Sequence, residues 1–164
     1  AHKFTDTPVW VKGSGAGSDH LALHDRPSIT QLRATQAAAK RAYATAGISA
    51  NDVDLAEVHD CFTIAEVLAT EDLGFASRGE GGRFAREGEG RRNEGHVTIN
   101  ASGGLKSKGH PLGATGTGQA VEIFKQLRNQ AEPARQVRDA ELGLTHNVGG
   151  SGATCAVHIF GRER

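Results

Sequence analysis

A strand-like run passes directly into a helix-like run near the middle of the chain, and this change of pattern constrains the fold more than any other feature. The run DLAEV at 54–58 reads as a short strand, and residues 62–73 read as a helix. Three large apolar side chains would share one half-buried face of that helix: Ile64, Val67 and Leu68. Only His-Asp-Cys, at 59–61, separates the two runs. The connection is therefore a tight corner that carries three reactive side-chain types.

Strand and helix signals continue to alternate along the rest of the chain. Short strands are predicted at 9–14, 140–146 and 154–160, and helices at 28–46 and 116–128. The first of these helices has a possible capping box, Ser28 with Gln31, and Gly47 at the position of a left-handed C-terminal cap. In the last strand His158 faces one way, and three side chains face the other: Cys155, Val157 and Ile159. Interleaved strands and helices followed by an antiparallel pair predict a layered α/β domain with a mixed sheet.

Length and composition bound the class of protein. The 164 residues suffice for one domain, and Lys plus Arg equals Asp plus Glu at 19 each, so no net charge favours nucleic acid or an anionic membrane. No run of about 18 apolar residues predicts a membrane span. The two cysteines, Cys61 and Cys155, lack a metal-type spacing and indicate reduced thiols of a cytoplasmic protein. Residues 77–95 are rich in glycine and in charges of both signs, which predicts a solvated surface excursion.

Unusual polar residues gather in three glycine-containing loops, each at a predicted strand end or helix start. The loops are 59–61, 100–118 with Gly109-His110-Pro111 inside it, and 146–152. Backbone N–H groups are unpaired at such positions and can bind an anion or an oxyanion. Glycine allows a substrate to approach the main chain closely. The loops are therefore the candidate site.

Each of these residues also has an ordinary structural role open to it. Cys61 could be a small buried apolar side chain, His59 could bond a neighbouring carbonyl, and Asp60 would be a good N-cap for the helix that follows. A metal site is disfavoured because the possible ligands lack a short repeated spacing. The run GATGTGQ, at 113–119, does not have the order of a nucleotide-binding loop. Taken singly, none of these motifs identifies a function.

Taken together, the three loops resemble the C-terminal half of a thiolase, and most resemble the sterol-carrier-protein-type and archaeal branch. The matching segments are HDCF at 59–62, NASGGLKSKGHPLGATGTGQ at 100–119 and THNVGGSGATCAVHIF at 145–160. The similarity runs in order through nearly the whole chain. It implies that residues 1–164 form one half of the layered thiolase-like α/β fold, a mixed five-stranded sheet with helices on both faces.

The resemblance also implies a reaction and three catalytic residues. Thiolases form or cleave 3-ketoacyl-CoA by a Claisen mechanism through a covalent acyl-cysteine, with acyl-CoA as substrate and no tightly bound cofactor. His110 matches the histidine that activates the nucleophilic cysteine. His59 matches an oxyanion-hole position that is asparagine in the commoner version of the motif. In this branch the thiol of the HDCF motif, Cys61, is expected to act as the acid/base.

Four further residues take expected roles from the same resemblance. The backbone N–H of Gly149 would complete the oxyanion holes together with the two histidines. Asn147 stands where many thiolases carry a second cysteine, which is why the acid/base role passes to the HDCF thiol. With Gly109 and Gly150, Asn147 is expected to contact the substrate. No metal is expected.

The nucleophilic cysteine of a thiolase lies in the N-terminal half, and no matching position occurs in this chain. We therefore expect either a fragment or a subunit that completes its site with a partner, and no turnover by the chain alone. The expected partners are acyl-CoA, the N-terminal half, further copies of the chain and, as in archaeal relatives, hydroxymethylglutaryl-CoA synthase and an OB-fold acyl-CoA-binding protein, but neither nucleic acid nor membrane. Two alternative functions stay open: a thiolase-like retro-aldolase, and a non-catalytic acyl-CoA-binding or assembly subunit.

Overall fold

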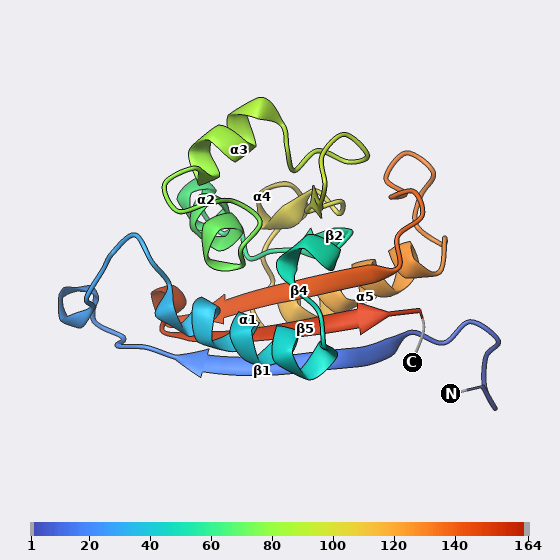
Figure 1. Cartoon of the computed structure of the whole chain (residues 1–164), viewed down its shortest axis with the longest axis horizontal. Coiled ribbons are helices and arrows are strands. Elements are labelled where there is room, and N and C mark those ends of the chain that lie inside the picture. The colour runs from blue at the N-terminus through green and yellow to red at the C-terminus, as the bar shows by residue number, and fades with distance from the viewer. Residues whose placement is uncertain (1, 163–164) are drawn as a thin grey trace.

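The structure, a computed structural model, describes residues 2–162 and is built on a five-stranded sheet (Figure 1). In chain order the elements are β1 (Trp10–Ser18), α1 (Arg33–Ala46), β2 (Leu55–Glu57), α2 (Thr63–Asp72), α3 (Gly81–Glu87), β3 (Thr98–Ile99), α4 (Gly104–Lys108), α5 (Thr115–Leu127), β4 (Leu142–Gly149) and β5 (Thr154–Gly161). Short 3-10 turns occur at Leu23–Asp25, Ala50–Asp52 and Gly150–Gly152.

The sheet is mixed, and its strands lie in the order β1-β5-β4-β2-β3. The central strand pair, β2 and β4, is parallel, and β3 runs parallel to β2 at the edge. β5 is antiparallel to both of its neighbours, β4 and β1. The final two strands therefore form the antiparallel pair that the sequence predicts.

Helix α1 covers one face of the sheet at very close range (Figure 1). Three glycines of β1 face the helix: Gly13, Gly15 and Gly17. A Cβ atom on Gly15 would lie 2.0 Å from the carbonyl oxygen of Ala38, which no side chain could tolerate. On the side of the helix, the packed residues are buried alanines at 34, 38, 39 and 42. The contact is therefore one of small residues that bring two backbones together.

Helix α5 covers the opposite face, so successive strand residues enter two different cores (Figure 1). Leu55 packs with Ile123 and Leu127 of α5, whereas its neighbour Ala56 belongs to the core under α1. In β5, the side chain of Ile159 likewise enters the α1 core. Both cores are apolar, and the prediction of a mixed sheet with helices on both faces is confirmed.

The N-terminus of α1 differs from the prediction. The helix begins at Arg33, and the hydroxyl of Ser28 accepts the N–H of Thr30 instead of capping it. Residues 28–32 lie outside the helix, so the predicted capping box is wrong. At the other end Gly47 has φ +71° and donates its N–H to the carbonyl of Tyr43. The predicted left-handed cap is confirmed.

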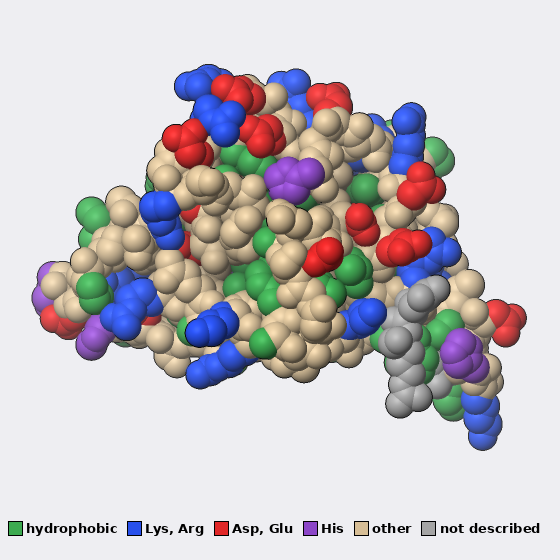
Figure 2. All heavy atoms as spheres, viewed as in Figure 1, with side chains coloured by type: hydrophobic (Ala, Val, Ile, Leu, Met, Phe, Trp, Pro, Cys, Tyr) green, Lys and Arg blue, Asp and Glu red, His purple; other side chains and the backbone are tan. Residues whose placement is uncertain are grey.

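The charged excursion at 77–95 is partly ordered into a helix, which the sequence did not predict. Helix α3 buries Phe84, which is 3% exposed, in the α1-side core. Around it Arg83 pairs with Glu80 and Glu87, and acidic and basic side chains intermingle over α3 (Figure 2). The exposed charges fit the prediction, but one aromatic side chain anchors the segment to the core.

Candidate active site

The three predicted loops meet at one end of the sheet. The parallel strands β2 and β4 both point their carboxyl ends toward this end, and α2 and α5 begin near it. Residues that follow parallel strands therefore gather there, as ligand-binding residues do in other α/β sheets. Residues 58–61, which follow β2, form a tight turn that we call the corner.

A cavity of about 650 Å³ opens among these loops. It is lined by five of the seven residues predicted for the site: His59, Cys61, His110, Gly149 and Gly150. Its volume is within the usual range for small-molecule sites. The two remaining residues do not line the cavity.

Those two residues lie close behind it. The side-chain amide of Asn147, on β4, donates to the Gln119 side-chain oxygen at 3.3 Å. Gly109 has φ +92° and ends α4 immediately before His110. Only glycine adopts this conformation readily, so its observed role is to turn the chain into the histidine.

The mouth of the cavity is apolar. Five large side chains, each at least 54% exposed, form what we call the apolar rim: Leu23, Ile29, Phe62, Ile64 and Leu112. The sequence placed Ile64 on a half-buried helix face, and this is wrong, because Ile64 is 60% exposed and turns toward the cavity. Such a contiguous exposed patch is characteristic of a surface that meets a ligand or another protein.

His59 and His110 face one another inside the cavity. Their rings meet edge to face, with centroids 4.8 Å apart. His59 is 5% exposed, and its Nδ1 is buried with no hydrogen-bond partner among residues 2–162. Burial, and then the nearness of His110, lower the pKa of His59 below its ordinary value. The ring is thus neutral at pH 7 and has an unused polar atom, which a bound ligand could satisfy.

The hydrogen bonds of His110 define which of its nitrogens carries the proton. Its Nδ1 lies 2.7 Å from the hydroxyl oxygen of Thr115, and that hydroxyl donates to the carbonyl of Pro111 at 3.2 Å. Because the hydroxyl hydrogen is used on the carbonyl, Thr115 accepts from Nδ1–H. Nε2 is then left with a free lone pair, the arrangement that a general base requires.

The two cysteines have different surroundings. Cys61 is half-buried, lines the cavity and lies just before α2. Cys155 is buried on β5, and burial raises its pKa to about 11, so it stays a protonated thiol at neutral pH. Both are free, as the sequence predicts. Only Cys61 is placed to react with a ligand.

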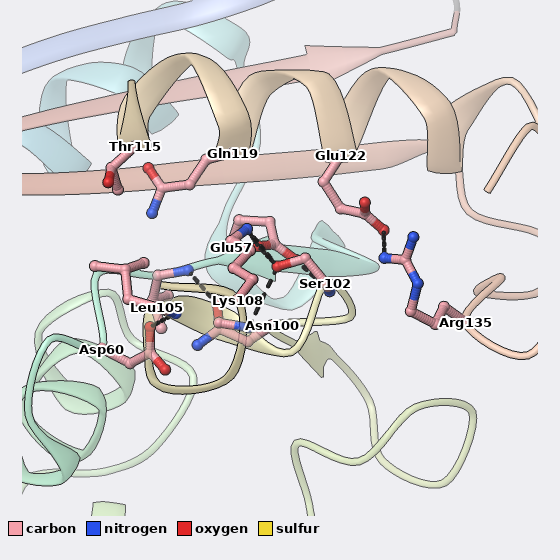
Figure 3. A network of polar contacts seen from close by, with 12 residues as sticks. Glu57, Asp60, Asn100, Ser102, Leu105, Lys108, Thr115, Gln119, Glu122 and Arg135 are labelled. Carbon is pink, nitrogen blue, oxygen red and sulfur yellow. Dashed lines mark hydrogen bonds and ion pairs between the residues drawn. The ribbon is translucent and has the colours of Figure 1, made fainter. Parts of the chain in front are cut away.

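Asp60 caps a different helix from the one predicted. The N-cap of α2 is Phe62, and no side chain bonds there. Instead Asp60 Oδ1 accepts the backbone N–H of Leu105, at the start of α4, over 2.6 Å (Figure 3). The sequence interpretation of a structural cap was correct in kind but wrong in partner, because Leu105 lies 45 positions away.

A buried histidine behind the corner supports His59. His146 is fully buried; its Nδ1 accepts the backbone N–H of His59 at 3.4 Å, and its Nε2 lies 2.9 Å from the hydroxyl of Thr35. Burial lowers the pKa of His146 to about 3, so it is neutral. The sequence analysis placed His146 in the third loop but assigned it no role. Its position in a strand of alternating apolar residues was the signal that could have predicted its burial.

Two properties of residues 2–162 concern metals and membranes. Residues 2–162 contain no cluster of three or more histidine, cysteine or acidic side chains suited to a metal ion. None of the helices in the same range combines the length and apolar character that crossing a bilayer requires.

Comparison with known proteins gives a consistent result. A family model described as thiolase C-terminal domain-like matches residues 15–162. Acetyl-CoA acetyltransferase of Methanothermobacter thermautotrophicus is 54% identical over 162 residues, which cover 99% of this chain and 42% of that protein. Sterol carrier protein 2 of Bos taurus is 46% identical over 116 residues, 71% of this chain and 21% of the relative. The chain thus spans about two fifths of the archaeal relative.

Solved structures share the fold at lower identity. The Ltp2-ChsH2(DUF35) aldolase superposes with a TM-score of 0.81 at 24% identity, covering 96% of this chain and 40% of that one. A monomeric SCP2-thiolase-like protein of Mycobacterium smegmatis superposes with a TM-score of 0.65 at 19% identity, covering 95% and 29%. At these identities the likeness concerns the fold alone.

Proposed function

Because this chain belongs to the thiolase C-terminal domain family, we propose that it supplies the acid/base and oxyanion-hole half of a thiolase active site. The reaction is the formation or cleavage of 3-ketoacyl-CoA, of the acetoacetyl-CoA type. The observation that carries the proposal is that His59, Cys61 and His110, from two loops about 50 positions apart, line one cavity. The 54% identity to an archaeal acetyl-CoA acetyltransferase supports the same activity.

In the proposed mechanism His110 prepares the nucleophile. Its Nε2 lone pair takes the proton from the nucleophilic cysteine of the complementary half, and the thiolate attacks the acyl carbonyl. The resulting tetrahedral intermediate collapses to an acyl-cysteine and releases CoA thiolate, which takes up the proton held on His110 Nε2. The Thr115 hydroxyl keeps the reactive tautomer in place throughout, because it accepts from Nδ1–H.

Cys61 then performs the second proton transfer. As a thiolate it removes the α-proton of acetyl-CoA, and the enolate attacks the acyl-cysteine carbonyl to form the new carbon–carbon bond. Collapse of the tetrahedral oxyanion expels the nucleophilic cysteine thiolate and releases the 3-ketoacyl-CoA. The α-proton held by Cys61 then passes to that thiolate, so both cysteines end the cycle as they began. Thiolysis is the same sequence in reverse. Cys155 is buried and stays protonated, so Cys61 is the one suitable thiol among the described residues.

Two oxygens become negative during this sequence, and neutral hydrogen-bond donors would stabilise them. Burial lowers the pKa of His59, so the ring is neutral and keeps one N–H that can be donated to a negative oxygen. The amide of Gly149 at the cavity wall is the second proposed donor. Gly150, Gly109 and Asn147 are proposed to shape the surface on which the substrate lies.

The proposed complementary half would cover the apolar rim. The archaeal relative extends over more than twice the aligned length, so most of that relative lies outside the aligned region. A second exposed apolar surface lies on the outer side of α5, at Val121 and Phe124, which are 45% and 40% exposed. Burial of both surfaces against the nucleophile-bearing half would remove them from water at roughly 25 cal/mol per Å².

The wider proposals follow from family membership. Acyl-CoA is the proposed substrate, without a tightly bound cofactor, and the proposed location is the cytoplasm. Self-association, and docking with hydroxymethylglutaryl-CoA synthase and an OB-fold acyl-CoA-binding protein, are proposed partnerships.

A retro-aldolase function is less well supported by the residues present. Enzymes of that kind tend to replace thiolase residues with tyrosine, whereas this chain keeps Cys61 and His110. Its only tyrosine, Tyr43, lies on α1 and donates its hydroxyl to the carbonyl of Leu73. Burial raises the pKa of Tyr43, which further opposes a catalytic role.

The test is thiolysis of acetoacetyl-CoA by the complete enzyme, with this chain joined to its nucleophile-bearing half. We expect Cys61→Ala and His110→Ala each to lower kcat by about 10³-fold, within the range for loss of a positioned acid or base. Cys155→Ala is the matched thiol control and should leave kcat within about threefold. Thiolysis that survives both active-site changes would reject the proposed mechanism and leave the acyl-CoA-binding or assembly role.

A further inference from the structure

Helix α4 brings His110 into the cavity, although the helix itself is only 5 residues long. A helix of this length is not stable alone in water and must be held by tertiary contacts. It ends at Lys108, and Gly109 then turns the chain into His110. Whatever holds α4 therefore also determines where the histidine ring lies.

One buried carboxylate binds both ends of the α4 segment. Glu57, the last residue of β2, is 1% exposed. Its Oε1 accepts the N–H of Ser102 at 3.0 Å, before the helix, and its Oε2 accepts from Lys108 Nζ at 3.2 Å, at the helix end (Figure 3). The Ser102 hydroxyl donates to the same carboxylate. Burial raises the pKa of Glu57, and the bonds to Ser102 and Lys108 act against that rise.

The next corner residues attach to the same segment. The N–H of Val58 donates to the side-chain oxygen of Asn100 at 2.8 Å, and Asp60 accepts the N–H of Leu105 at 2.6 Å. At Gly104 the approach is so close that a Cβ would lie 2.2 Å from Asp60 Oδ2. Of four consecutive residues, 57 to 60, three are therefore tied to residues 100–108.

The fourth residue, His59, takes no part in these bonds. Its ring turns into the cavity and meets His110 edge to face at 4.8 Å. Contacts on both sides of His59 in the sequence thus fix the corner against α4. The relative position of the two histidine rings is a consequence of that attachment.

We propose that Glu57 and Lys108 are positioning residues that hold His110 against His59 and Cys61 by clamping α4 to the end of β2. The proposal rests on the proposed function in one respect, since it takes His110 and His59 to be the groups that act on the substrate. Neither Glu57 nor Lys108 lines the cavity, so both act through His110. Displacement of a catalytic group by about 1 Å can lower a rate by about 100-fold.

The experiment compares Lys108→Met with Lys106→Met in the complete enzyme. Both lysines lie on α4 and both are exposed, but Lys106 has no hydrogen bond or ion pair within residues 2–162, whereas Lys108 bonds Glu57. We expect Lys108→Met to lower kcat for acetoacetyl-CoA thiolysis by about 10- to 100-fold with KM changed less than about twofold. Lys106→Met should leave both constants unchanged. Glu57→Gln should lower kcat to a similar extent as Lys108→Met. Because the pair acts as a unit, kcat of the double variant should lie within about twofold of kcat of the poorer single variant.

Two readouts separate positioning from mere stability. The pH profile of kcat/KM should shift in Lys108→Met, and the through-space NMR contact between the His59 and His110 rings should weaken. Rates are expressed per folded molecule from a denaturation curve of each variant. If Lys108→Met lowers only the fraction of molecules that are folded, and leaves the rate per folded molecule, the pH profile and the ring contact unchanged, the proposal is overturned.

His110→Ala separates failure of this proposal from failure of the proposed function. If His110→Ala leaves thiolysis intact, the thiolase mechanism itself is rejected, and the clamp with it. If His110→Ala abolishes thiolysis while Lys108→Met behaves like Lys106→Met, only the clamp is rejected. The expected result is loss of rate in both His110→Ala and Lys108→Met.

Discussion

Helices α1 and α4 are both held against the sheet, but by opposite means. The 14-residue α1 meets the glycines of β1 mainly through close packing of buried alanines, with a hydrogen bond from Arg41 to the carbonyl of Ala16. The 5-residue α4 is held by hydrogen bonds and an ion pair to the residues after β2. The first contact is mainly apolar and lies away from the cavity, whereas the second places His110 in the cavity. Apolar packing gives this domain its stability, and buried polar contacts give the candidate site its geometry.

The largest expected effect comes from breaking the first contact. Gly15→Ala places a Cβ 2.0 Å from the carbonyl of Ala38, and backbone on both sides must move. We expect the free energy of unfolding to fall by about 3 kcal/mol, as for severe overpacking. Gly82→Ala, where nothing lies within 4 Å, is the control and should be neutral or stabilising by up to about 1 kcal/mol. Equal urea midpoints for the two variants would contradict this account of α1.

The next effect comes from breaking the second contact. Asn100→Ala removes the acceptor for the Val58 N–H and the donor to Glu66. Because a buried N–H would lose its partner, we expect a loss of about 2 kcal/mol in the free energy of unfolding.

Asn129→Ala is a matched control for that change. Both asparagines have positive φ, 52° and 55°, but the Asn129 side chain has no hydrogen bond within the described range. The difference between the two variants measures the polar contact without the cost of the backbone conformation. No difference in urea unfolding would mean that the bonds to Asn100 contribute nothing.

A third prediction concerns the point where the two regions meet. His146 joins Thr35 of α1 to the backbone of His59, and its pKa is lowered to about 3 from an ordinary value of 6.5. The unfolded state therefore binds the proton more readily, so this stability is complete above about pH 6.5 and is lost as pH falls toward 3. Between pH 7 and 5 we expect a loss of about 2 kcal/mol from this group.

The measurement is urea unfolding at the two pH values. His146→Gln should show a smaller loss between pH 7 and 5 than the unaltered protein. His24→Gln, at an exposed histidine, should show the same loss as the unaltered protein. An unchanged pH dependence in His146→Gln would argue against a buried neutral ring at this position.

The smallest predicted effect separates geometry from stability most clearly. Thr115→Val removes the acceptor that fixes the tautomer of His110 but keeps the shape of the side chain. We expect kcat of the complete enzyme to fall about tenfold, about 1.4 kcal/mol in the barrier, with a small change in stability. Thr45→Val is the control, because Thr45 lies at an exposed position of α1 and its hydroxyl bonds only its own helix. Equal kcat for the two variants would show that the Thr115 bond has no catalytic role.

The sequence predicted the features that depend on local pattern. Alternation and glycine position located β1, β2, β4 and β5, the helices α1, α2 and α5 and the cap at Gly47, but not β3 or α4. The three loops contained the two histidines and the thiol that line the cavity. The features it missed depend on distant partners. Asp60 bonds Leu105 across 45 positions, and His146 bonds Thr35 across 111. The burial of Phe84 could not be predicted, because its sequence neighbours are charged residues and glycines, which indicate an exposed segment.

The measurement that tests the central claim most directly is exchange of the α-protons of acetyl-CoA with D₂O by the complete enzyme. If Cys61 is the acid/base, Cys61→Ala should lower the exchange rate by about 10³-fold while still accepting an acetyl group on the nucleophilic cysteine. Exchange at the rate of the unaltered enzyme in Cys61→Ala would contradict the account.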